Sequence, residues 1–149
     1  MLTQEHLDLP FTYESMAEAG SMLGTASMIV VDDAQPLVPL ALRLAEFYRH
    51  ESCGKCVPCR EGTNWTVKML ERVVRGEATP MDLDIIASVQ ENIIGNCLCV
   101  LGDSMAMPVG AMVRRWRGEF EETIARAREA GAAALDVEPA VMTPAGVGA

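Results

Sequence analysis

The stretch from His50 to Gly62 reads H-E-S-C-G-K-C-V-P-C-R-E-G. Its cysteines, Cys53, Cys56 and Cys59, follow one another at intervals of three residues. A C-x2-C-x2-C spacing lets one short loop direct several sulfur atoms toward one point, as a thiolate-bound metal centre requires. The stretch therefore predicts a metal-binding loop, and the fold must bring a further ligand to it.

The missing ligand must come from a distant part of the chain. Position 63 is Thr, whereas the continuous ferredoxin pattern has a cysteine there. The candidates are Cys97 and Cys99, which lie in the segment N-C-L-C-V-L-G-D at residues 96–103. In an antiparallel helical bundle, the loops after the first and third helices lie at the same end. A site with sulfur ligands can close there through either cysteine.

The spacing also discriminates between metals. Three ligands on one loop and a remote fourth are typical of a [4Fe–4S] cluster, whereas structural zinc usually binds two C-x2-4-C pairs. The pattern favours the cluster over zinc, thiol redox chemistry or structural thiols, although one of Cys97 and Cys99 is plausibly structural. His50 is better explained as a helix-end residue than as a ligand. Lys55 and Arg60 either ease reduction of the cluster or are ordinary surface charges.

Composition excludes several functional classes. The chain has 149 residues, 50% of them hydrophobic, and a formal net charge of −9. Binding of nucleic acid or of an anionic membrane needs an excess of Lys and Arg, so neither is expected. No apolar run approaches the ~20 residues of a membrane span. The first ten residues lack the basic and apolar regions of a secretory signal, which indicates a reducing compartment where clustered thiols bind metals. No dinucleotide-binding or P-loop motif is present.

Apolar residues recur at helical spacing in much of the chain, and the pattern predicts a mainly α fold, a four-helix bundle. Pro36 suits the first turn of the first helix, and Gly76 and Gly95 are predicted to end the second and third. Thr79 is predicted to cap the third helix, and Pro108 falls near the start of the fourth. The four apolar stripes run over residues 37–48, 65–73, 83–93 and 105–124.

The N-terminal part differs from the rest. Residues 27–31, S-M-I-V-V, resemble a β-strand, and a single strand cannot form a sheet alone. We therefore expect residues 1–34 to be the end of a larger unit, residues 35–130 to form the helical bundle, and residues 131–149 to be a disordered tail.

The motif E-S-C-G-K-C-V-P-C-R-E-G at 51–62, followed by C-V-L-G-D at 99–103, resembles a known family. This family is the NADH-binding, flavin-bearing F-type subunit of respiratory NADH:quinone oxidoreductase (complex I). Flavin subunits of NAD-reducing hydrogenases and NAD-dependent formate dehydrogenases share the signature. The resemblance extends over about residues 1 to 130. It implies that residues 1–34 end a ubiquitin-like, soluble-ligand-binding β-grasp domain, a short β remnant before the iron–sulfur bundle.

The resemblance also implies a cofactor and its ligands. In the family, the C-terminal bundle holds one [4Fe–4S] cluster, which takes single electrons from FMN that NADH has reduced. The matching ligands are Cys53, Cys56, Cys59 and Cys99, and no catalytic residue is expected. Cys97 becomes the spare thiol.

The family's larger assembly sets the expected partners. FMN and NADH bind to an N-terminal part that this chain lacks, so we do not expect the chain to be active by itself. The implied partners are a flavin-bearing domain as electron donor, a thioredoxin-like [2Fe–2S] subunit and a larger iron–sulfur subunit. The implied location is cytoplasmic and peripheral to the inner membrane, without direct membrane insertion. The alternatives are a zinc-stapled helical interaction module and a non-functional truncated fragment.

Overall fold

Helices make up the regular structure of the part of the chain that the computed structural model describes, residues 1–131. The predicted mainly α class is confirmed, and the predicted tail lies outside the described residues except for Gly131. Within residues 1–131, no helix is both long enough and apolar enough to cross a membrane. The elements are the 3-10 helix η1 (Gln4–His6) and the α-helices α1 (Tyr13–Glu18), α2 (Leu37–Glu51), α3 (Val57–Val74), α4 (Pro80–Ile93), α5 (Leu101–Arg115) and α6 (Arg117–Glu129).

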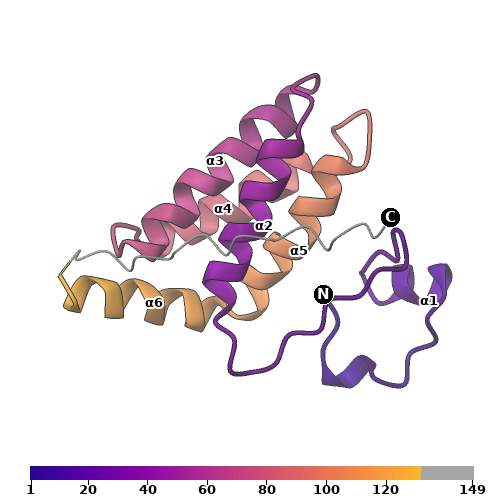
Figure 1. Cartoon of the computed structure of the whole chain (residues 1–149), viewed down its shortest axis with the longest axis horizontal. Helices are drawn as coiled ribbons and strands as arrows, with labels where there is room; N and C mark the ends of the chain where they lie inside the picture. Colours follow the sequence, from indigo (N-terminus) through magenta and orange to yellow (C-terminus); the bar gives the residue numbers. More distant parts are fainter. Residues whose placement is uncertain (132–149) are drawn as a thin grey trace, which may run out of the picture.

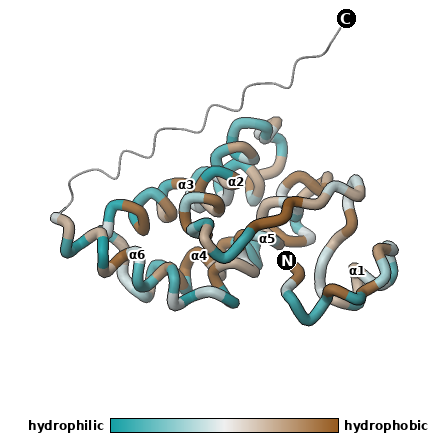
Figure 2. The backbone as a smooth tube through the Cα atoms, turned by 60° about the horizontal axis from the view of Figure 1, so that its bottom comes forward, coloured by the Kyte–Doolittle hydropathy of each residue, from teal (hydrophilic) through white to brown (hydrophobic). Residues whose placement is uncertain are grey.

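The bundle consists of α2 to α5, with α6 across one end (Figure 1). Helix α2 packs against α3 and α5, and α4 packs against the same two helices. Apolar and polar positions alternate along the helices, as amphipathic helices require (Figure 2). Each fully buried large apolar side chain contributes about 1.5–3 kcal/mol to folding. Those at the centre include Leu70, Leu83, Ile86, Met105 and Phe120.

The predicted start of α4 is confirmed in detail. The backbone N–H and the hydroxyl of Thr79 both donate to Asp82 Oδ2, at 2.6 and 2.8 Å. Arg72 Nη1 donates to Asp82 Oδ1 at 2.9 Å, which ties α3 to the first turn of α4. The backbone N–H of Thr79, its hydroxyl and the Arg72 guanidinium together hold the pKa of Asp82 below its usual value. Pro80 occupies the first helical position, where a missing N–H costs nothing.

The predicted fourth helix is two helices, so this prediction was wrong. The backbone leaves the helical region at Trp116, with φ −117° and ψ 34°, and α6 then turns across the end of the bundle. Phe120 and Ile124 are buried on α6, so apolar residues keep their helical spacing across the break. The spacing of apolar residues therefore cannot reveal that the helix ends at Trp116. Helix α5 also begins at Leu101, earlier than predicted, so Pro108 lies in the helix interior.

The predicted strand at 27–31 does not form, and the β remnant is not seen within residues 1–131. Met28, Ile29 and Val30 lie in irregular backbone with 68%, 74% and 84% of their surfaces exposed. A strand needs a neighbour to receive its backbone hydrogen bonds, and no other segment of the described part of the chain pairs with this one. The segment with α1 lies beside the bundle (Figure 1).

The connection between α2 and α3 and the connection between α4 and α5 lie at the same end of the bundle, away from α6 (Figure 1). These two connections, together with the first turn of α3, carry the five cysteines of the chain. The bundle topology therefore brings together two thiol-bearing loops that are about forty residues apart, as the antiparallel arrangement predicts.

Candidate metal centre

The first loop is shaped by the end of α2 and the beginning of α3. Ser52 is the C-cap of α2, and Gly54 has a φ of +75°, a conformation that disfavours any residue with a side chain. Cys56 is the N-cap of α3, and Cys59 lies in its first turn. The first N–H groups of a helix have no partner within the helix, and they favour negative charge. The loop thus places two thiols where anionic ligands are stabilised.

The second loop is fixed by the L-G-D part of its motif. A Cβ on Gly102 would lie 2.9 Å from Cys97 Sγ and 2.9 Å from Ile93 Cγ2, closer than real carbon contacts allow. Asp103 Oδ1 accepts a hydrogen bond from the backbone N–H of Gly95 at 2.8 Å. Glycine therefore permits the start of α5 to pack against the loop, and the aspartate ties the loop's beginning to that helix.

The two loops touch each other through a sulfur atom. The backbone N–H of Leu98 donates to Cys56 Sγ at 3.3 Å. The residues are 42 positions apart in sequence, so this bond is a contact between the loops. The expected meeting of the two cysteine segments is confirmed.

The individual thiols differ in exposure. Cys59 is buried, Cys56 and Cys97 are half-buried, and Cys53 and Cys99 are exposed, and all five are free of disulfides. Within residues 1–131, no group of three or more His, Cys, Asp or Glu side chains is arranged so that it can hold a metal ion. The predicted ligand set of Cys53, Cys56, Cys59 and Cys99 therefore stays a prediction.

Cys97 has a distinct environment. Its Sγ lies 3.7 Å from the carbonyl oxygen of Ile93 and against Gly102, between α4 and the start of α5. Burial raises the pKa of the Cys97 thiol, and the negative charges of Cys59, Cys56 and Asp103 raise it further. A backbone hydrogen bond from Cys59 opposes these effects without cancelling them. The neutral thiol is therefore the favoured form, as for a packed cysteine.

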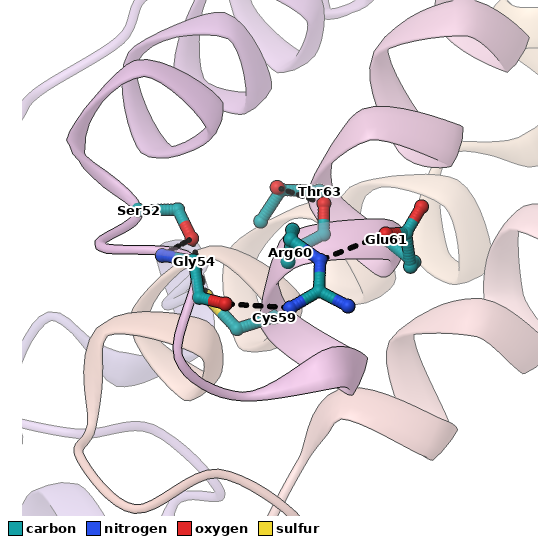
Figure 3. Close-up of polar contacts among 6 residues, drawn as sticks. All are labelled: Ser52, Gly54, Cys59, Arg60, Glu61 and Thr63. Atoms are coloured by element: carbon teal, nitrogen blue, oxygen red, sulfur yellow. Dashed lines mark hydrogen bonds and ion pairs between the residues drawn. The ribbon is translucent and has the colours of Figure 1, made fainter.

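A polar network lies beside Cys59 (Figure 3). Ser52 Oγ lies 3.3 Å from Cys59 Sγ, and the backbone N–H of Gly54 donates to Ser52 Oγ at 3.3 Å. Arg60 Nη1 donates to the carbonyl oxygen of Gly54 at 2.7 Å, and its Nε donates to Glu61 at 2.9 Å. Arg60 is thus part of the loop's structure as well as a charge beside the thiols.

Two further residues near the cysteines in the sequence, His50 and Lys55, are exposed. The His50 side chain is 85% exposed, and its Nδ1 is 2.8 Å from Glu51 Oε1. Sequence reasoning missed Ser52, the N–H of Leu98 and Asp103 as parts of the site. The residues near the cysteines in the motifs E-S-C and C-V-L-G-D could have indicated these supports. A loop that binds metal through its sulfurs needs hydrogen-bond donors and packing around them.

A helical bundle with cysteine-bearing loops at one end defines a class of protein, the small helical domain that binds a metal centre through thiolates. Comparison with known sequences then identifies the family. The NADH-ubiquinone oxidoreductase-F iron-sulfur binding region matches residues 39–123, and the chain belongs to this family. Its cofactor is a [4Fe–4S] cluster. The resemblance inferred from the two motifs is confirmed.

Similar proteins point to the same family. The F-type subunit of the NADH-quinone oxidoreductase of Mycobacterium tuberculosis (strain ATCC 25618 / H37Rv) is 40% identical over 149 residues, which is 100% of this chain and 33% of that protein. The F-type subunit of the Streptomyces coelicolor enzyme is 45% identical over 124 residues, covering 83% of this chain and 28% of that protein. The chain thus spans about a third of the length of these relatives.

A solved structure resembles the fold. It is the NAD+-reducing [NiFe]-hydrogenase in the air-oxidized state, with a TM-score of 0.59 and 34% sequence identity. The match covers 63% of this chain and 17% of that chain. A similar helical fold therefore also occurs in a NAD+-reducing hydrogenase.

The donor set of this chain fits the family's cofactor. An iron–sulfur cluster bound by thiolates carries negative charge, and N–H and O–H donors around the sulfurs stabilise it. Here an N–H group contacts Cys56 Sγ and a hydroxyl contacts Cys59 Sγ, both beside the N-terminus of α3. These contacts suit anionic sulfur ligands.

Proposed function

We propose that the chain is an electron-transfer module that holds one [4Fe–4S] cluster on Cys53, Cys56, Cys59 and Cys99. The observation that carries this proposal is the hydrogen bond of 3.3 Å from the N–H of Leu98 to Cys56 Sγ. It brings the segment that contains Cys99 against the loop that contains the other ligands. Ligands that are remote in sequence thereby become neighbours in space.

The motif match and the packing of Cys97 support Cys99 as the remote ligand, and Cys97 is itself close enough to Cys56 and Cys59 for their charges to raise its pKa. Cys97 Sγ is directed toward the carbonyl of Ile93 and is enclosed by Gly102, so its sulfur is already packed. Cys99 is exposed and follows Leu98, whose N–H points at Cys56. A side chain without packing constraints can turn toward the other sulfurs without disturbing the core.

When bound, the cluster supplies a site that accepts and gives up one electron at a time. The chain's own residues do the rest of the work. The bundle holds the two loops in a fixed relation, and the half-buried position of Cys56 and the buried position of Cys59 restrict water on the inner side. The donors on their sulfurs stabilise added negative charge.

The proposed context is a larger oxidoreductase. Electrons would come from FMN that NADH has reduced, on a flavin-bearing domain, and would pass to further iron–sulfur clusters. The partners would be a thioredoxin-like [2Fe–2S] subunit and a larger iron–sulfur subunit, on the cytoplasmic side of the inner membrane. The names of the similar subunits and of the similar hydrogenase support this context. Residues 1–34 would be the end of a β-grasp domain whose remaining strands lie on another part of the protein.

The ligand assignment is tested by a pair of substitutions. We expect Cys99→Ser to lose the cluster or change its electron paramagnetic resonance spectrum after anaerobic reconstitution with iron and sulfide. Cys97→Ser is the matched control, and it should keep the iron and sulfide content and the spectrum of the unchanged chain. Cluster loss in Cys97→Ser with retention in Cys99→Ser would contradict the assignment.

A further inference from the structure

Ser52 occupies a special position in the first cysteine loop. Its Oγ lies between two groups, the backbone N–H of Gly54 and the sulfur of Cys59, at 3.3 Å from each. Figure 3 shows the serine side chain directed toward Cys59 from the end of α2. The hydroxyl therefore connects the loop backbone to one of the proposed ligands.

The direction of the hydrogen bond to sulfur follows from the chemistry of its two atoms. The N–H of Gly54 can only donate, so the serine oxygen is the acceptor in that bond. Its own hydrogen stays free for a second partner. A cysteine that ligates a metal is a thiolate and has no hydrogen to give. The serine hydroxyl must then donate to Cys59 Sγ.

The loop holds this hydroxyl in place from several directions. Gly54 adopts a φ of +75°, which turns its N–H back toward Ser52. The carbonyl of the same glycine accepts a hydrogen bond of 2.7 Å from Arg60 Nη1, so the first turn of α3 fixes the peptide that orients the serine. Glu61 in turn pairs with Arg60 Nε at 2.9 Å. The donor is thus prearranged by the loop and is not a freely rotating surface hydroxyl.

We propose that Ser52 raises the reduction potential of the cluster by donating a hydrogen bond to Cys59 Sγ. The proposal rests on the proposed function, because it needs a cluster on Cys59. Reduction adds one negative charge, and part of that charge resides on the sulfur ligands. A hydrogen bond to sulfur stabilises the reduced state more than the oxidised state, so it makes reduction easier. Ser52 acts through Cys59 and is a positioning residue.

The test is a redox titration of the full chain, reconstituted anaerobically with iron and sulfide. Ser52→Ala removes the donor, and we expect the equilibrium constant for reduction to fall by up to about tenfold, because only the difference in hydrogen-bond strength between the reduced and oxidised states affects it. For a one-electron couple, a tenfold fall is about 59 mV toward more negative potential. Iron and sulfide content per chain is measured on each sample before the titration.

A pair of variants separates the effect of the hydroxyl from the effect of the side chain's shape. Thr and Val have nearly the same shape, and Ser52 has extended backbone, with φ −63° and ψ 122°, that accepts either residue. Ser52→Thr should keep the potential of the unchanged chain, whereas Ser52→Val should shift it as Ser52→Ala does. Ser104→Ala is a further control, because the Ser104 hydroxyl donates to the carbonyl of Val100 at 2.8 Å rather than to sulfur.

The outcomes distinguish this inference from the proposed function. A cluster in all variants with equal potentials in Ser52→Thr and Ser52→Val would overturn the role of Ser52 and leave the proposed function standing. Absence of iron and sulfide from the unchanged chain would overturn both. Loss of the cluster from Ser52→Val but not from Ser52→Thr would overturn the proposed effect on potential, since it would show that the hydroxyl is needed to hold the cluster.

Discussion

Individual residues around the thiols explain why the two motifs contain more than cysteines. In E-S-C-G-K-C, Ser52 contacts Cys59 Sγ, and Gly54 supplies both the positive φ and the N–H that orients the serine. In C-V-L-G-D, Gly102 permits close packing against Cys97, and Asp103 accepts from the N–H of Gly95. Each of these noncysteine residues therefore supports a loop that the sulfurs alone cannot shape.

The role of Gly102 leads to a prediction at this scale. Gly102→Ala places a methyl group 2.9 Å from both Cys97 Sγ and Ile93 Cγ2, so one side of the loop must shift. We expect the free energy of unfolding to fall by about 1–3 kcal/mol, the usual cost of overpacking a core. The change is measured from the midpoint of denaturant unfolding at constant slope.

Gly118→Ala is the matched control for Gly102→Ala. Gly118 lies in α6, and a Cβ there would meet no heavy atom within 4 Å. Alanine stabilises a helix relative to glycine, so this variant should be unchanged or more stable by up to about 1 kcal/mol. Equal stability of the two variants would contradict the packing role that we assign to Gly102.

The sequence predicts helix boundaries best where a local signal marks them. Thr79, Pro80 and Asp82 predict the start of α4 because a capping box acts within one turn and needs no tertiary contact. The ends of α3 and α4 are likewise followed by Gly76 and Gly95, both with positive φ.

Helix breaks and faces that depend on tertiary packing were predicted less well. The break at Trp116 carries no comparable signal, because Phe120 and Ile124 keep the apolar period on the new axis. The apolar stripe predicted for residues 65–73 begins at Trp65, but 55% of the surface of Trp65 is exposed. The buried face of α3 instead includes Thr66 and Val67. Hydrophobicity alone does not decide which face a short helix buries.

The capping box of α4 has a pH-dependent consequence. The folded-state pKa of Asp82 is lowered from 3.8, chiefly by the backbone N–H of Thr79, so the folded state favours the carboxylate. This contribution to stability is present above about pH 4 and is lost as the pH falls through the lowered pKa. We expect Asp82→Asn to reduce the free energy of unfolding by about 1 kcal/mol at pH 7, and by progressively less below pH 4.

Denaturant unfolding at a series of pH values from 7 to 3 checks this expectation. Asp33→Asn is the control, because Asp33 is exposed in the irregular N-terminal segment, and its effect should stay within about 0.5 kcal/mol at every pH. An effect of Asp82→Asn that stays constant down to pH 3 would show that the carboxylate charge does not stabilise the first turn of α4.

At the scale of the whole molecule, the bundle topology is what makes a site from two distant segments. The loops meet because α2 to α5 alternate in direction, and this arrangement could be predicted from apolar periodicity and loop length. Which of Cys97 and Cys99 faces the first loop could not be predicted from spacing, since they are two residues apart. The two cysteines differ in environment, because Cys97 is packed against Ile93 and Gly102 while Cys99 is exposed, and the choice of Cys99 as the ligand stays a prediction.

In the N-terminal segment, the sequence predicts a strand that the structure does not form. Met28, Ile29 and Val30 have the composition of a buried strand and yet are largely exposed. A strand forms only with a hydrogen-bonding neighbour, which no local propensity can supply.

The central claim is that the two loops together hold one [4Fe–4S] cluster. Its most direct test is the content of iron, acid-labile sulfide and zinc per chain after anaerobic purification and reconstitution with iron and sulfide. We predict about four iron and four sulfide per chain, with a broad visible absorption that bleaches on reduction. Zinc at about one per chain, with no acid-labile sulfide and no reducible absorption, would contradict the claim and indicate a zinc-stapled helical module instead.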